Sequence, residues 1–337
     1  MNLQEDKYTR YALVREMMDS ISLIKEFDPA QTQQVAGQIG EVGRLMLTGE
    51  GSSRIFPAKN AIRTALMRGS QTTILTDGSW QCAQYDLTRF AVFCASNSGK
   101  TKEVVMLARK LAESTPHRFG LCAHRGTPLE QACSRTFILN CGAENAVAAT
   151  KSVLEQALFY HSIVWHLCGG KPGGWQEELA DQIQFSLTMP IDPAIIRAAA
   201  KATTLYFAGY NDGVAEELTL KTNEITRKKA DFLEGTYAVH GIEEVLDRED
   251  VVFVIDPLEQ EVEKFQQVLE QGVGLTVVAI AAKKTAFPTI LVPEAGEMNP
   301  YLFLCAGWNV LVEIGLSLGI NLDQPTRARK VGNELAS

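Results

Sequence analysis

The sequence predicts an α/β protein of two domains, each a mostly parallel sheet with helices on both faces. Short β-branched or apolar runs alternate with helical stretches, the pattern of parallel sheets joined by crossover helices. The two halves of the chain look like copies of one another. A chain of 337 residues is also long enough for two domains of ordinary size. We place the first domain, with an N-terminal helix, at residues 1–192, and the second, with a C-terminal tail, at residues 193–337.

A duplication relates the two halves. The segments RLMLTGEGSSRIFPAKNAI, from residue 44, and TLYFAGYNDGVAEELTLKTNEI, from residue 204, follow one pattern. Each has a β-rich run that ends in a small residue, then a glycine turn and a long helical stretch. The copies lie about 160 residues apart, which is too far for a solenoid repeat and fits two copies of a whole domain.

The elements follow in order from this alternation. In the first half, strands are expected at Arg44–Thr48, Thr72–Leu75, Phe90–Cys94, Phe119–Cys122 and Thr136–Leu139, with helices near Pro57–Arg68, Lys102–Glu113 and Leu129–Cys133. In the second half, strands are expected at Thr204–Phe207, Val251–Ile255, Leu275–Ile280 and Thr289–Val292. Helices Ala148–Leu167 and Pro300–Leu318 close the halves, and the join lies around Gly169–Gly174 or in the helix that follows.

Composition excludes several classes of partner. The net charge is −8 and there is no basic block, so neither nucleic acid nor an anionic membrane is an expected partner. No apolar stretch approaches the length of a membrane span, and the N-terminus is not a secretory signal. The seven cysteines are scattered singly, which predicts a reduced, cytoplasmic protein. The five histidines show no metal-ligand spacing, so neither a metal nor an organic cofactor is expected.

The most informative residues are Glu217, Lys221, Glu224 and His240. The first three are spaced i, i+4, i+7, so they stack along one face of a helix. His240 follows in a loop-like stretch. A carboxylate, an ammonium and an imidazole that converge in one place can move protons on a sugar without a metal.

An alternative is that Glu217 and Lys221 form an ordinary solvent-exposed helix pair. Against it, the charged residues adjoin an apolar stripe of Val214, Leu218 and Ile225, which suits the wall of a cleft. The basic residues 227–229 are expected at the solvated C-terminal end of the same helix, where they complement its dipole.

A phosphate site is predicted where the strand FAVFCA runs into SNSGKTKEVV. Hydroxyl side chains, free backbone N–H groups and a helix N-terminus together suit a phosphate dianion, and Gly99 permits the tight turn. The turn GEGSSR at 49–54 is a second hydroxyl-rich turn, expected at the same edge of the sheet. An ordinary serine-capped helix start would look similar. Neither GxxxxGK[ST] nor GxGxxG is present, so a nucleotide is not implied.

Four stretches together resemble a known family: GEGSS at 49–53, ASNSGKT at 95–101, AENAVAATK at 143–151 and DQPTRARKV at 323–331. The chain resembles double SIS-domain (sugar isomerase) proteins, and within them the isomerase half of glucosamine-6-phosphate synthase and the fructosamine-6-phosphate deglycases. The resemblance implies two flavodoxin-like SIS domains that work as a homodimer.

The resemblance also implies roles for individual residues. Glu224 would be the base that shuttles a proton between C1 and C2, with Lys221 and Glu217 orienting it. His240 would open the sugar ring and would serve the neighbouring subunit's site. Lys330 would match a tail lysine that can form an imine with a ketose. The sugar phosphate would be bound by Ser52, Ser53, Ser96, Asn97, Ser98 and Thr101, with Val147 lining the site.

Some positions depart from the pattern of the synthase. Lys100 replaces an acid, Ala149 removes a hydroxyl, and Ile242 replaces the proline that usually follows the histidine and glycine. No N-terminal cysteine nucleophile is present to release ammonia, so synthesis from glutamine is not expected of this chain. The expected activity is instead deglycation of a 6-phosphorylated ketosamine to a hexose 6-phosphate and a free amine. The alternatives are an amino-sugar-6-phosphate deaminase or isomerase, and a regulator that binds sugar phosphates without catalysis.

Overall fold

The computed structural model describes residues 1–170, 173–330 and 332–335. The chain divides into two compact units, each assembled from separate segments. Unit 1 contains Met1–Ile21, Asn145–Ala148 and Glu178–Arg327; unit 2 contains Ser22–Glu144, Ala149–Glu177 and Ala328–Ser337. The predicted boundary at residues 192 and 193 falls between the last strand of one sheet and the first strand of the other, and as a domain boundary it stays a prediction.

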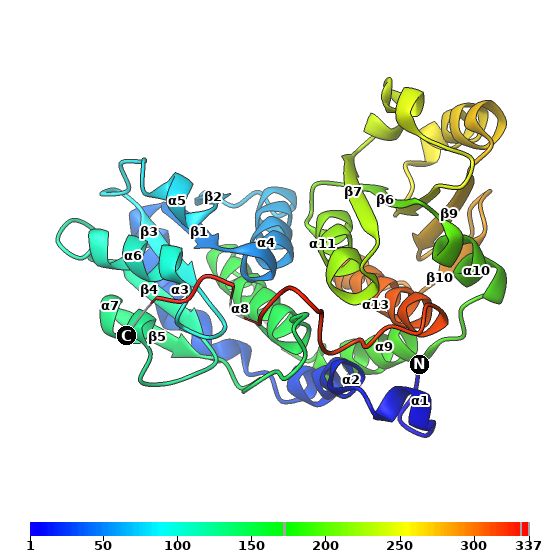
Figure 1. The fold of residues 1–337 in the computed structure, drawn as a ribbon. Coiled ribbons are helices and arrows are strands. Elements are labelled where there is room, and N and C mark those ends of the chain that lie inside the picture. Colours follow the sequence, from blue (N-terminus) through cyan, green and yellow to red (C-terminus); the bar gives the residue numbers. More distant parts are fainter. Residues whose placement is uncertain (171–172, 331, 336–337) are drawn as a thin grey trace. The chain divides into compact units, whose positions relative to one another are not determined.

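Unit 2 contains a five-stranded parallel sheet with the order β2-β1-β3-β4-β5 (Figure 1). Its strands are β1 Arg44–Gly49, β2 Thr73–Asp77, β3 Ala91–Ala95, β4 Arg118–Cys122 and β5 Arg135–Ile138. All five were predicted from the sequence to within three residues at each end. This order is that of the flavodoxin-like doubly wound folds, in which a ligand binds where the strand order reverses, here between β1 and β3.

Helices cover both faces of this sheet, as the alternation along β3 shows. Val92 and Cys94 are buried in one apolar cluster, together with residues of α6 Lys102–Lys110 and α7 Pro128–Ala132. Phe93 points to the opposite face, because successive strand residues alternate. There its ring contacts Phe159 of α8 Lys151–Leu167, at 5.7 Å between centroids. The predicted covering of both faces is therefore confirmed.

Unit 1 contains a second parallel sheet with the order β10-β9-β8-β6-β7. The strands are β6 Thr204–Gly209, β7 Lys229–Glu234, β8 Val251–Ile255, β9 Thr276–Ala281 and β10 Thr289–Leu291. Counted in chain order, this is the same 2-1-3-4-5 arrangement as in unit 2. The identical topology agrees with the duplication that the sequence indicated.

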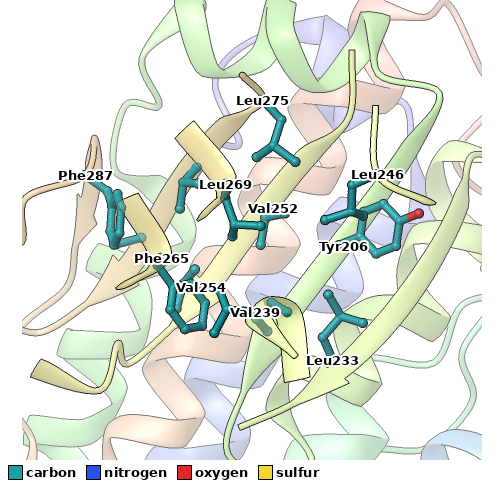
Figure 2. Packing of buried hydrophobic residues seen from close by; sticks show 14 residues of the cluster. Tyr206, Leu233, Val239, Leu246, Val252, Val254, Phe265, Leu269, Leu275 and Phe287 are labelled. Atoms are coloured by element: carbon teal, nitrogen blue, oxygen red, sulfur yellow. The ribbon is translucent and has the colours of Figure 1, made fainter. Parts of the chain in front are cut away.

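The two faces of the second sheet are also both buried. On one face, Tyr206 and Val252 pack in a cluster with Phe265 and Leu269, residues of the helical segments α12 Val262–Phe265 and Gln266–Val273 (Figure 2). On the other side of the pleat, Phe207 stacks on Phe253 with centroids 5.3 Å apart. The remaining helices of the described chain are α1 Asp6–Thr9, α2 Ala12–Lys25, α3 Gln33–Val42, α4 Ile55–Met67, α5 Ser79–Cys82, α9 Gln176–Thr188, α10 Pro193–Lys201, α11 Val214–Thr226 and α13 Asn299–Ser317.

Strand β7 was not predicted. Of the basic residues 227–229, Arg227 lies at the helix C-terminus as predicted, but its side chain is half-buried and Lys229 already belongs to β7. The helix ends at Thr226, Arg227 adopts a left-handed conformation with φ 61°, and Lys229 already pairs with Thr204 of β6. The guanidinium of Arg227 donates to the carbonyls of Glu224 and Asn321, so it caps the helix instead of lying in solvent. Because β7 is an edge strand, its sequence KADFLE can carry charged residues. It therefore lacks the continuous apolar run by which the other strands were predicted.

One helix corrects the statement that no apolar stretch is long enough to span a membrane. Residues Gly296–Ser317, which include α13, pass that test by length and composition. However, 83% of the apolar window is buried inside the protein. Helix α13 contacts α10, α11 and β9, all in unit 1, so its apolar sequence is explained by a central place in the core of that unit.

Candidate functional site

Helix α11 carries the three charged residues that the spacing singled out. It begins directly after the turn that follows β6, where Gly213 adopts φ 92°, a conformation that suits glycine. The carboxylate of Asp212 accepts a hydrogen bond from the backbone N–H of Val214 at 3.0 Å and so caps the first turn. The helix therefore starts at the carboxyl end of a parallel strand, the edge at which α/β folds place their ligands.

The three side chains meet as the spacing predicted. The ammonium of Lys221 lies 3.4 Å from Oε1 of Glu217 and 2.8 Å from Oε2 of Glu224. The side chains of Glu217 and Lys221 are completely buried, whereas that of Glu224 is 27% exposed. The alternative of a solvent-exposed surface pair is therefore wrong.

Burying these charged side chains costs free energy, so a functional reason for the burial is expected. A carboxylate and an ammonium taken out of water each lose several kcal/mol of hydration, which their attraction offsets only in good geometry. Lys221 donates a hydrogen bond to Glu224 and forms an ion pair with Glu217, and of the three side chains only that of Glu224 is open to solvent. Lys221 therefore fixes the direction of the Glu224 carboxylate from behind. Such a held, partly exposed carboxylate is suited to accept and return a proton.

His240 lies in the same unit, after β7 and the short helical turn Tyr237–Val239. Its backbone N–H donates to the carbonyl of Tyr237 at 3.1 Å, and the residue is exposed. Among the described residues its imidazole has no hydrogen bond or ion pair. The structure thus leaves this ring available to an incoming group, and its roles in ring opening and at a neighbouring subunit's site stay predictions.

The serine loop of unit 2 follows β3 directly. Ser96 is buried, and its hydroxyl lies 2.8 Å from that of Thr101 and 3.5 Å from that of Ser98. The backbone N–H groups of Lys100 and Thr101 are directed at the hydroxyls of Ser98 and Ser96. The loop residues thus hold one another in a tight turn, with their hydroxyls gathered on one side.

The second hydroxyl-rich turn lies beside the first. Gly49 at the end of β1 pairs with Ala95 at the end of β3, so the turn Gly51–Ser53 and the serine loop follow adjacent strand ends. Ser52 and Ser53 are both half-buried. The predicted gathering of the two turns at one sheet edge is confirmed, and it coincides with the point where the strand order reverses.

Gly99 is essential to the shape of this loop, and we expect Gly99→Ala to distort it. Gly99 has φ +65°, and an added Cβ would lie 2.5 Å from the hydroxyl of Thr127. We expect a loss of about 1–3 kcal/mol of unfolding free energy and weaker binding of a phosphorylated sugar. Urea denaturation and a ligand titration would measure both.

Gly126→Ala is the matched control for this change. Gly126 has φ +70° but has no atom within 4 Å of an added Cβ. It therefore reports the cost of the backbone conformation without the clash. If both variants bound the phosphorylated sugar equally, the requirement for a close approach at Gly99 would be contradicted.

Asn97 contacts Glu144, which was not among the predicted site residues. Its side-chain amide donates to Oε2 of Glu144 at 3.1 Å, and Glu144 is fully buried at its side chain. Glu144 lies in AENAVAATK, one of the four stretches that carry the family resemblance. The available signal was a single acid placed before a run of small apolar residues that leads into a helix.

The tail of the chain contacts the serine loop. The N–H of Lys102 donates to the carbonyl of Asn333 at 3.0 Å, and the N–H of Leu335 donates to the carbonyl of Lys100 at 2.9 Å. Glu334 is bridged to Thr101 and lies 3.4 Å from the ammonium of Lys100. The sequence had predicted free backbone N–H groups at this helix start, and for Lys102 that prediction was wrong. The tail also places Lys330, whose ammonium lies 3.6 Å from Glu144.

Val147 belongs to unit 1, in the short segment Asn145–Ala148. Its N–H donates to the carbonyl of Asp323 at 2.9 Å, and the side chain is half-buried. Asp323 also accepts hydrogen bonds from the backbone of Ala12 and Leu13 at the start of α2. Val147 is thus positioned by elements from both ends of the chain, and its contact with a substrate stays a prediction.

The reversal point of the second sheet holds a cavity too small for a sugar. It is lined by Gly209, Tyr210, Asp256 and Phe265, among others, and has a volume of about 10 Å³. This is roughly the space of one water molecule. The second copy of the duplicated strand–turn–helix unit contributes the charged face of α11 and lacks the pair of serines found in GEGSS.

Comparison with known proteins identifies part of the chain. Residues 89–165, which include β3, the serine loop and most of α8, match the SIS domain family. The chain is 22% identical over 272 residues to a glutamine–fructose-6-phosphate aminotransferase (isomerizing) of Streptomyces coelicolor, covering 71% of this chain and 43% of that protein. A protein of the same name from Corynebacterium glutamicum is 23% identical over 272 residues, covering 71% and 42%. The chain spans about two fifths of the length of these relatives.

Solved structures share the fold of nearly the whole chain. The C-terminal domain of glucosamine-fructose-6-phosphate aminotransferase from Francisella tularensis has a TM-score of 0.76 and 15% identity, covering 96% of this chain and 100% of that one. Tagatose-6-phosphate ketose/aldose isomerase from Escherichia coli has a TM-score of 0.77 and 16% identity, covering 96% and 99%. Glucosamine-6-phosphate deaminase from Thermotoga maritima has a TM-score of 0.74 and 18% identity, covering 95% and 99%.

The family match ends before the second sheet begins at Thr204, so the assignment of a second SIS domain stays a prediction. The matched residues contain the serine loop. Residues 89–165 therefore match the SIS domain family, and nearly the whole chain shares the fold of the solved structures named above.

Proposed function

We propose that the protein is an enzyme that deglycates a 6-phosphorylated ketosamine. The observation that carries this proposal is the Glu217–Lys221–Glu224 array, a buried ion pair that presents one exposed carboxylate at a strand-end helix. A regulator that only binds a sugar phosphate does not need this array. Binding requires hydroxyl and amide groups, but it does not require a carboxylate that is held in place to accept a proton. The names of the related proteins, which act on amino sugars and ketose phosphates, support the same chemistry.

The proposed reaction moves one proton between neighbouring carbons. The serine loop and the GEGSS turn bind the phosphate, and His240 assists opening of the sugar ring. Glu224 removes a proton from C1 of the open-chain ketosamine, which gives a C1–C2 enaminol. Return of a proton to C2 gives the aldose imine, and water adds to C1 to release the amine and leave a hexose 6-phosphate. No reactant other than water is consumed.

The second candidate is an amino-sugar-6-phosphate deaminase or isomerase. It is favoured by the fold shared with the deaminase from Thermotoga maritima. The same carboxylate would then act on a 2-amino sugar and release ammonia. Assembly as a homodimer of double-SIS chains, with His240 serving the neighbouring site, and a cytoplasmic location are parts of the proposal that apply to both candidates.

A substrate panel separates these functions. The protein is incubated in deuterium oxide with fructosamine 6-phosphates that carry different amines, and separately with glucosamine 6-phosphate. We expect release of hexose 6-phosphate and free amine from the first group, with deuterium incorporated at C2 of the product. Release of ammonia from glucosamine 6-phosphate alone would favour the deaminase. Binding of either group without turnover would overturn catalysis and leave the regulator.

A further inference from the structure

Glu144 contacts two of the predicted site residues, Asn97 and Lys330, as well as the start of α8. Its Oε1 accepts the backbone N–H of Thr150 at 2.7 Å and that of Ser152 at 3.4 Å. Its Oε2 accepts the hydroxyl of Ser152 at 2.7 Å and the amide of Asn97 at 3.1 Å, and it lies 3.6 Å from the ammonium of Lys330. All of these residues belong to unit 2.

The two oxygens of this carboxylate have different partners. Oε1 is fixed by backbone donors at the start of α8, which itself packs on the sheet. The direction of Oε2 is therefore set by rigid structure, and Oε2 is the oxygen that bonds Asn97 and faces Lys330. A charged acceptor that is desolvated and rigidly held orients its donors more strongly than a solvated one, since its hydrogen bonds are charge-assisted.

We propose that Glu144 is a positioning residue, which fixes the amide of Asn97 and the ammonium of Lys330 at the serine loop. It joins segments more than 200 positions apart, since Asn97 belongs to the serine loop and Lys330 to the tail that pairs with Thr101 through Glu334. The meaning of this arrangement for turnover rests on the proposed function, while the positioning of Lys330 does not.

The ion pair also determines where the charge of Lys330 lies. In this arrangement Lys330, whose side chain is 32% exposed, presents a positive charge toward solvent and toward an anionic ligand. Glu144 therefore holds the Lys330 ammonium where its charge can attract an anionic ligand.

Glu144→Gln tests the positioning with little change in shape. The glutamine oxygen can replace Oε1 and accept both backbone N–H groups. Its NH2 group then occupies the place of Oε2, where it faces two donors, Asn97 and Lys330. Both should turn away. Glu155→Gln is the matched control, because Glu155 is also buried in unit 2 and its two oxygens accept the backbone N–H groups of Asn140 and Cys141 instead of the side-chain donors of Asn97 and Lys330.

The readout is the rate at which Lys330 of the full chain is acetylated by trace acetic anhydride, measured by peptide mass spectrometry. We expect Glu144→Gln to raise this rate roughly two- to fivefold, the effect of losing a partly exposed ion pair, and Glu155→Gln to leave it unchanged. If Glu144→Gln does not fold, Ser152→Ala removes the hydroxyl from Oε2 at 2.7 Å and should give a smaller rise. Unchanged acetylation in both variants, or an equal rise in Glu155→Gln, would overturn the proposal.

A second measurement separates this inference from the proposed function. With an active ketosamine, Glu144→Gln should raise KM for the phosphorylated substrate more than it lowers kcat, whereas Glu155→Gln should alter neither beyond its effect on stability. If no substrate is turned over by the wild-type protein but Lys330 acetylation responds as expected, the proposed function fails and the positioning role stands. If the wild-type protein turns over a ketosamine but the acetylation rate of Lys330 does not change in Glu144→Gln, the positioning role fails and the proposed function stands.

Discussion

Replacing Glu224 by glutamine is expected to lower turnover of a 6-phosphorylated ketosamine by about 10²- to 10⁴-fold while leaving its binding nearly intact. Glutamine has almost the same shape and can still accept a hydrogen bond from Lys221, which lies 2.8 Å from the carboxylate in the wild-type protein. It cannot accept the C1 proton. The loss should therefore appear in kcat, because the removed interaction exists only in the transition state. Steady-state kinetics and a titration with the substrate measure the two quantities.

Glu234→Gln provides the control for charge. Glu234 ends β7 in the same unit, is exposed, and has no part in the array on α11. Removing its charge changes the net charge of the protein by the same amount and should leave kcat unchanged. A Glu224→Gln protein that retained wild-type turnover would contradict the assignment of Glu224 as the base. A protein that bound the sugar phosphate but showed no turnover even as wild type would point to a regulator.

Lys221→Met is expected to have the largest effect on stability. Lys221 is completely buried and lies within 3.4 Å of Glu217 and 2.8 Å of Glu224. Removing it takes away the ammonium that compensates a buried carboxylate, and breaking a buried pair in this way costs about 3–5 kcal/mol. Turnover should also fall, because Glu224 loses the group that holds its direction. The midpoint of urea denaturation and the kinetics of the folded fraction would be measured.

The double variant Glu217→Gln/Lys221→Met distinguishes charge from packing. It removes the charge of the buried carboxylate together with that of its cation, so no buried charge of this pair is left. We expect it to recover much of the stability lost in Lys221→Met, since hydrophobic replacement of whole buried pairs is often near neutral. Activity should stay low because Glu224 still lacks Lys221. Equal instability in the single and double variants would contradict the electrostatic origin of the effect.

The parts of the fold that sequence predicts are those with a local cause. The strands of unit 2 are short apolar runs between glycine turns, and the charged face of α11 follows from i, i+4, i+7 spacing alone. Strand β7 has no such pattern. It is an edge strand in which exposed and half-buried residues alternate up to Phe232 and Leu233 alone is buried, and it becomes a strand because it pairs with β6 along its whole length.

The parts of the site that sequence did not predict depend on contacts between distant residues. The sequence around Glu144 shows a single acid before a run of small apolar residues, but it does not show the partners Asn97 and Lys330, which the sheet and the tail bring to it. Likewise, the N–H of Lys102 is occupied because the carbonyl of the distant Asn333 accepts its hydrogen bond. A loop motif indicates that its backbone N–H groups can bind an anion. It does not reveal which distant segments of the chain form hydrogen bonds with those same N–H groups.

The interleaved make-up of unit 1 has a consequence for how the chain is made. The hydroxyl of Tyr8 donates to Glu313 at 2.5 Å, and the N–H of Leu13 donates to Asp323 at 2.8 Å, so the first helices are completed by residues some 300 positions later. At ordinary rates of translation, those partners leave the ribosome roughly 15–60 s after the N-terminal segment. During that interval the apolar face of α2 lacks its final contacts in unit 1. Until then, this segment of the nascent polypeptide is open to chaperones and to aggregation.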